Sequence, residues 1–178
     1  QGHAEAQRSL GAMYDEGEGV PQDYAHAAQW YRKAADQGHA EAQRSLGAMY
    51  DEGEGVPQDY AHAAQWYRKA ADQGDAIAQH NLGAMYYSGQ RVPEDYAQAV
   101  QWFRKAADQG HAHAQYNLGT MYDSGREVPQ DDVQAVKWFR KAADQGHARA
   151  QSNLGAMYAS GRGVPRDDAG AAQWYRKA

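Results

Sequence analysis

The sequence predicts an all-α solenoid built from five tandem helix-turn-helix repeats of 36 residues. Displacing the sequence by 36 residues superimposes one tryptophan from each repeat, and this register holds along all 178 residues. The tryptophans are Trp30, Trp66, Trp102, Trp138 and Trp174. Residues 1–36 and 37–72 are identical at every position, which indicates either a recent duplication or deliberate design.

The chain is expected to form one solenoid domain over residues 1–178. Its repeats are expected at residues 1–36, 37–72, 73–108, 109–144 and 145–178. The apolar fraction is 42%, and it leans on alanine and includes only 2 phenylalanines. Such small side chains fill a thin layer between helices, so each repeat is expected to be stabilised chiefly by its neighbours.

The first helix of each repeat is predicted over residues 3–16 in the first copy. Apolar residues recur there at i, i+4, i+7 and i+8, which places them on one helical face. These residues are Ala6, Leu10, Met13 and Tyr14. Gly17 follows them and is expected to end the helix in the left-handed conformation.

A loop and a second helix complete the repeat. Pro21 biases the residue before it to an extended conformation, so residues 18–22 are predicted to form the loop. Asp23 is a good N-cap for a second helix that ends at Gly38. The apolar face of this helix consists of Ala27, Tyr31, Ala34 and Ala35.

The order of these residues resembles a known repeat pattern. Leu10, Gly11, Tyr14, Ala27, Tyr31 and Ala34 follow the order of the tetratricopeptide repeat, with a longer loop between the helices. Residues 78–86, 102–107 and 163–165 resemble the Sel-one-like repeat family. That resemblance implies a right-handed α/α superhelix that scaffolds protein complexes. Some secreted members carry a disulfide in each repeat and are linked to binding cell-wall or β-lactam compounds, whereas this chain has no cysteine.

Composition excludes several classes of partner. The net charge of -5 lacks the dense basic footprint of a nucleic-acid-binding surface, so DNA and RNA are not expected partners. No apolar run of membrane-spanning length is present, so no membrane association is expected. The absence of cysteine excludes thiolate metal sites and leaves the cellular compartment unassigned.

Variation among the repeats points to a binding stripe on the first helix. Glu5, Arg8 and Asp15 belong to the positions that differ between copies, and their spacing defines one stripe. In tetratricopeptide-like superhelices the matching stripe lines the concave groove. The third and fourth copies replace several of its charges with apolar and aromatic side chains, and an asparagine recurs at the position of Ser9 in the third, fourth and fifth copies; both kinds of side chain favour contact with a partner. The predicted partner-binding residues are Ile77, His80, Asn81, Tyr87, His113, Tyr116, Asn117 and Asn153. The alternative for the asparagines is a bond within their own helix pair or exposure to water.

Other features favour structural roles. The aromatic residues at Trp30 and Tyr31 and their copies have the spacing of packing faces, and Gly11 and its copies are expected to permit close helix contact. The histidines that begin the first helices, such as His147, are expected to be solvated. His111 and His113 form a pair without a third ligand, and no serine has a base and an orienting group beside it, so we predict no metal, no cofactor and no catalysis.

The sequence therefore predicts a non-catalytic scaffold that binds an extended peptide or a partner helix. The alternative is a duplicated or designed building block that associates head to tail, because polar end caps are missing and the net charge of the repeats runs from -3 in the first to +3 in the fifth. A hydrolase or a binder of cell-wall compounds is the least favoured alternative.

Overall fold

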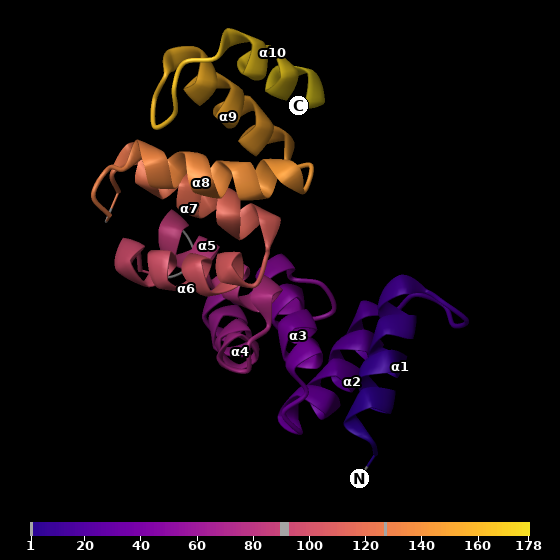
Figure 1. Ribbon diagram of the computed structural model, residues 1–178. Coiled ribbons are helices and arrows are strands. Elements are labelled where there is room, and N and C mark those ends of the chain that lie inside the picture. Colours follow the sequence, from indigo (N-terminus) through magenta and orange to yellow (C-terminus); the bar gives the residue numbers. More distant parts are fainter. Residues whose placement is uncertain (1, 90–92, 127) are drawn as a thin grey trace. The chain divides into compact units, whose positions relative to one another are not determined.

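The computed structural model describes residues 2–89, 93–126 and 128–178. In these residues it contains ten α-helices and no strand, so the predicted all-α repeat fold is confirmed. The helices follow one another as hairpins along the chain (Figure 1). They are α1 (Ala4–Glu16), α2 (Tyr24–Asp36), α3 (Ala40–Glu52), α4 (Tyr60–Asp72), α5 (Ala76–Ser88), α6 (Tyr96–Asp108), α7 (Ala112–Ser124), α8 (Asp132–Asp144), α9 (Ala148–Ser160) and α10 (Asp168–Lys177).

The chain divides into two compact units, Gln1–Glu94 and Asp95–Ala178. The first unit holds α1 to α5 and the second holds α6 to α10. Within each unit every helix packs against the next one in the sequence. No helix in the described part of the chain has the length and apolarity needed to cross a membrane.

The predicted helix ends follow from local capping. The side chain of Asp23 accepts a hydrogen bond from the backbone N–H of His26 at 2.9 Å and thereby caps α2. Gly17 ends α1 in the left-handed conformation at φ 73°. The second helix ends at Asp36, two residues before the predicted end, and Gly38 at φ 89° then makes the tight turn into α3.

The loop between the two helices of a repeat is fixed by bonds back to the first helix. The backbone N–H of Asp23 donates to the carbonyl of Tyr14 at 2.8 Å, and the amide of Gln22 donates to the carbonyl of Asp15 at 2.7 Å. These bonds satisfy carbonyl groups at the end of α1 that the helix itself leaves unpaired. The loop therefore has a defined conformation although it is longer than that of a tetratricopeptide repeat.

The core of each unit is a layer of small and aromatic side chains between successive helices. In the first unit Leu46 and Met49 of α3 lie buried with Tyr67 of α4. A Cβ on Gly47 would stand 2.8 Å from Cδ1 of the Tyr67 ring, so only glycine lets this ring lie on the backbone of α3. Gly119 and Phe139 repeat the arrangement in the second unit, which agrees with the expected close helix contact.

A buried glutamine joins each repeat to the one before it. The side-chain amide of Gln43 donates to the carbonyl of Ala35 at 3.1 Å, and Gln73 donates to the side-chain oxygen of Gln43 at 2.7 Å. The Ala35 carbonyl also accepts the backbone N–H of Gly38 at 2.9 Å, so the buried amide adds a second hydrogen bond there and stabilises the junction between the repeats. The same bond recurs at Gln79, Gln115 and Gln151.

Candidate interaction surface

The stripe on the first helices is charged in the first two repeats. The guanidinium of Arg8 donates to Glu5 at 2.6 Å and lies 3.6 Å from Glu41 of the next repeat. Arg44 in turn donates to Asp75 at 3.2 Å. These charges therefore form ion pairs within and between repeats.

The histidines at the start of the first helices also differ from expectation. His39 is half-buried: its Nδ1 accepts the backbone N–H of Ala42 at 3.3 Å and its Nε2 lies 2.8 Å from a carboxylate oxygen of Glu5. The hydrogen bond with His39, followed by that from Arg8, lowers the pKa of Glu5 below its usual value. The predicted solvated position is thus wrong for His39, and likewise for His111 and His147, whose Nδ1 atoms cap α7 and α9 in the same way.

The predicted residues of the third repeat lie on α5, in the first unit. Ile77 is 43% exposed, which is unusual for a large aliphatic side chain in this chain. His80 and Asn81 contact each other through Nδ1 and Oδ1 at 3.2 Å, and Tyr87 is half-buried near the end of the helix. The third repeat therefore places one exposed aliphatic side chain on the same helix as half-buried polar and aromatic side chains.

The second unit brings His113 and Tyr116 together around a residue that the sequence analysis did not select. Nδ1 of His113 lies 3.1 Å from Nε2 of His147. The ring of Tyr116 stacks on His147 with centroids 4.6 Å apart, and its other neighbour is Phe139 at 5.9 Å. Glu5 and His39 are 34 residues apart, and so are His113 and His147. A search for chemically matched residues at this separation could have identified the His113–His147 pair from the sequence.

The protonation of this pair follows from its hydrogen bonds. Since the backbone N–H of Ala150 can only donate, Nδ1 of His147 accepts, and a neutral His147 carries its proton on Nε2. That proton is donated to Nδ1 of His113. Burial, and then the neighbouring His113, lowers the pKa of His147. The neutral form of His147 is therefore favoured, and its ring presents an aromatic face to Tyr116.

A hollow of about 260 Å³ lies on the same helices. Its floor includes the buried side chains of Phe139 and Met157, and Asn153 and Asp123 stand in its wall. The complete lining is Asp123, Phe139, Asn153, Ala156, Met157, Ser160 and Arg162. An apolar floor with an amide and a carboxylate in the wall can hold one side chain of a partner and bond to its backbone. Asn153 is the one predicted residue that lines it.

Arg162 closes one side of the hollow. Its guanidinium donates to Asp123 at 2.7 Å and to Asp132 at 2.6 Å. The hydrogen bond to Asp132 is the main reason that the pKa of Arg162 is raised. Sequence reasoning missed it because its partners lie 30 and 39 residues earlier in the chain.

Tandem helical hairpins with a conserved internal register define a class of α/α repeat proteins, whose members bind partners along the surface of stacked helices. Within this class, the profile of the Sel1 repeat matches residues 4–39, 40–75, 76–111, 112–147 and 148–178. The chain belongs to the Sel1 repeat family. The matched repeats have the predicted period and begin three residues later than the divisions chosen from the sequence.

Solved structures agree with this assignment. A protective antigen of uropathogenic Escherichia coli with an SLR fold is 41% identical, with a TM-score of 0.95 over 98% of this chain and 37% of the antigen. A Sel1 repeat protein from Oxalobacter formigenes is 38% identical, with a TM-score of 0.92 over 98% of this chain and 70% of that protein. This chain thus spans little more than a third of the antigen. Comparison of the sequence with curated proteins gives no significant match.

Membership of this family indicates a general kind of function. Sel1 repeat proteins generally mediate protein–protein interactions, and the family is typically a non-catalytic scaffold.

Proposed function

We propose that this protein is a scaffold that binds an extended peptide or a helix of a partner along the exposed stripe of its first helices. The observation that carries the proposal is the hollow on α7 and α9, whose wall includes Asn153 and whose apolar floor lies beside the Tyr116 ring. Aromatic rings next to a partly desolvated hollow are typical of binding hot spots.

The chemistry of the surface favours a peptide over a small charged ligand. Asn153 can both donate and accept, so it can pair with a peptide backbone whatever the side chains. Arg162 already binds Asp123 and Asp132, so its charge is neutralised within the protein. An uncharged extended segment with one apolar side chain for the hollow therefore fits this surface best.

Site-specific photocrosslinking tests the proposal. A benzoylphenylalanine at position 153 on α9 should crosslink a partner in cells, and mass spectrometry would identify it. The same group at position 173, on the exposed side of α10, is the matched control and should not crosslink that partner. Equal crosslinking from both positions would contradict binding at the first-helix stripe.

Affinity measurements with the identified partner then test the residues. Tyr116→Ala should weaken binding by about tenfold or more, as expected for an aromatic hot spot. Its melting curve, followed by circular dichroism, should show that the helices remain folded. If Tyr116→Ala and Asn153→Ala both bind the partner with the affinity of the parent protein, this part of the surface is not the binding site.

A further inference from the structure

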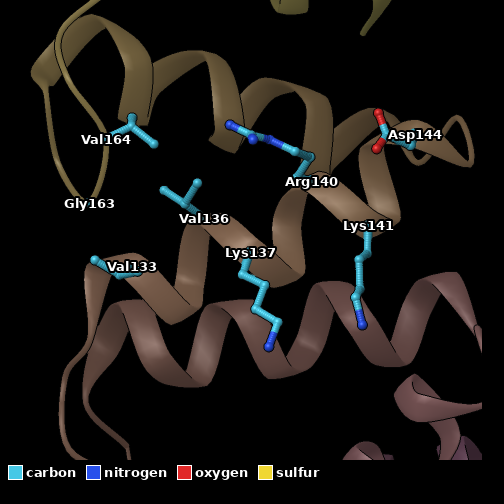
Figure 2. Close-up of a pocket in the computed structure, with 8 residues that line it drawn as sticks. All are labelled: Val133, Val136, Lys137, Arg140, Lys141, Asp144, Gly163 and Val164. Atoms are coloured by element: carbon cyan, nitrogen blue, oxygen red, sulfur yellow. The ribbon is translucent and has the colours of Figure 1, made fainter.

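A second surface in the same unit lies on α8, the second helix of the fourth repeat. A pocket of about 400 Å³ lies between this helix and the loop that follows α9. Figure 2 shows the side chains that line it. Its lining consists of Val133, Val136, Lys137, Arg140, Lys141, Asp144, Gly163 and Val164. None of these residues lines the hollow of the first-helix stripe.

The pocket has an apolar end. Val133, Val136 and Val164 gather there, as seen in Figure 2. Val133 is 61% exposed, more than any other large hydrophobic side chain in the described residues, whereas Val136 beneath it is buried. The backbone of the loop closes this end, because a Cβ on Gly163 would stand 2.2 Å from the carbonyl oxygen of Asp132. Burial of an exposed valine by a partner would be favourable.

The remainder of the pocket is cationic. Lys137, Arg140 and Lys141 follow the valines along α8, and Asp144 is the single acidic residue of the lining. Lys137 and Lys141 extend to one side of the helix and Arg140 to the other (Figure 2). Two of these cations are held in position by neighbouring rings. The guanidinium of Arg140 donates to the hydroxyl of Tyr158, and Nζ of Lys141 lies 4.4 Å from the centre of the Trp138 ring. Fixed cations lose little side-chain entropy when they bind a carboxylate.

Two of the lining residues distinguish the fourth repeat from all others. The position of Val133 is alanine in the other four copies, at Ala25, Ala61, Ala97 and Ala169. The position of Lys137 is glutamine in the same copies, at Gln29, Gln65, Gln101 and Gln173. Val133 and Lys137 lie one turn apart on the same stripe of α8, so the apolar end and its adjacent cation occur together in one repeat. Packing within a repeat does not require either side chain, because four copies form the same helix without them.

From these observations we infer that the α8 pocket is a second docking site, for an acidic segment of a partner protein that carries one aliphatic side chain. The aliphatic group lies against Val133 and Val136, and flanking carboxylates pair with Lys137 and Arg140. The net charge of the lining is +2, which complements an acidic segment. The short apolar end fits a single side chain and offers no extended face for lipid chains.

Methyl NMR of the complete chain provides the test. The probe is a synthetic acetylated peptide of one leucine flanked on each side by two glutamates. The methyl signals of Val133, Val136 and Val164 should shift saturably on titration. Replacing the glutamates by glutamines, or the leucine by glycine, should remove the shifts, because both chemical features are needed. If the peptide with glycine binds as well as the peptide with leucine, the shifts report only general charge attraction, and the proposal is overturned.

Variants that restore the side chains of the other repeats sharpen the test. Val133→Ala together with Lys137→Gln should weaken peptide binding by about tenfold, because an aliphatic contact and an exposed charge pair are both lost. Lys105→Gln on α6 is the matched control: Nζ of Lys105 also lies over a tryptophan ring, at 3.9 Å, and its loss should leave binding unchanged. Asn153→Ala should also leave it unchanged, which separates this site from the first-helix stripe.

A membrane surface is the competing partner. Vesicles of phosphatidylcholine with phosphatidylglycerol should leave the three valine signals unchanged. If the vesicles shift these signals and the peptide does not, the docking of an acidic protein segment is overturned. The proposal is also overturned if the double variant Val133→Ala, Lys137→Gln binds the peptide with the affinity of the parent protein.

Discussion

At the scale of single residues, this protein uses the offset between repeats to place side chains in pairs. Position 5 of one repeat meets position 3 of the next, as Glu5 with His39 in the first unit and as His113 with His147 in the second. The first pair attracts when its histidine is protonated, whereas the second pair repels when both histidines are. The same contact between repeats therefore joins unlike groups in the first unit and like groups in the second.

The His113–His147 pair predicts a loss of stability in mild acid. The pKa of His147 is lowered in the folded chain from its ordinary value of 6.5, so its contribution is fully present above pH 6.5 and is lost as the pH falls toward the folded pKa. The groups facing it are His113, Arg149 and the Tyr116 ring; burial, then His113 and Arg149, disfavour its charged form. Urea unfolding of the parent and of His147→Asn, which keeps a capping oxygen, should give free energies that diverge only below about pH 6.5. A titration of His147 by NMR with a pKa above 6.5 would contradict this account.

At the scale of the helices, caps and glycines rather than large apolar faces define where each element begins and ends. Each second helix starts at an aspartate whose side chain accepts a backbone N–H, as Asp131 does from Gln134 at 2.9 Å. The helices α1, α3, α7 and α9 each carry a glycine that lets an aromatic ring lie on the helix backbone, as at Gly119. Since alanine fills most of the remaining interface, these few residues specify the hairpin.

Removal of one cap should therefore destabilise the chain measurably. Asp131→Ala leaves the N–H of Gln134 without its acceptor and should lower the free energy of unfolding by about 1 kcal/mol. Asp131→Asn is the control, because an amide oxygen can accept the same bond, and it should recover most of that free energy. Chemical denaturation followed by circular dichroism measures both. Equal losses in the two variants would assign the effect to the charge and not to the cap.

At the scale of the whole molecule, the two units differ in charge. Residues 95–178 contain eleven basic and nine acidic residues, whereas residues 1–94 contain seven basic and fourteen acidic ones. This difference motivates the alternative in which copies associate head to tail. It also means that the two docking surfaces proposed on α7 to α9 belong to the unit with positive net charge.

Sedimentation velocity distinguishes the scaffold from the self-associating building block. We expect one monomeric species whose sedimentation coefficient does not change between about 20 mM and about 500 mM NaCl, because exposed charge pairs contribute little to association and salt screens them. The measurement should be made over a series of protein concentrations. Growth with concentration at low salt that disappears at high salt would favour head-to-tail association and would require the partner-binding experiments to be repeated at high salt.

The sequence by itself determined the elements. The 36-residue period, the apolar spacing, Asp23 and Gly17 are local signals, and they predicted the repeat, both helices and their caps to within two residues. It also selected the stripe that holds Asn153, since variation among copies can be seen without a structure. These predictions succeed because helix formation and capping depend on residues fewer than five positions apart.

Only the tertiary structure decided which residues of successive repeats meet. The buried Gln43 bond, the pairing of His113 with His147, the bridge from Arg162 to Asp123 and the pocket beside Val133 all join residues about 30 positions or more apart, or elements of different repeats. Their contacts depend on the distance and rotation between one hairpin and the next. No local propensity encodes that offset, because it results from packing of alanines and rings against backbone across the whole interface.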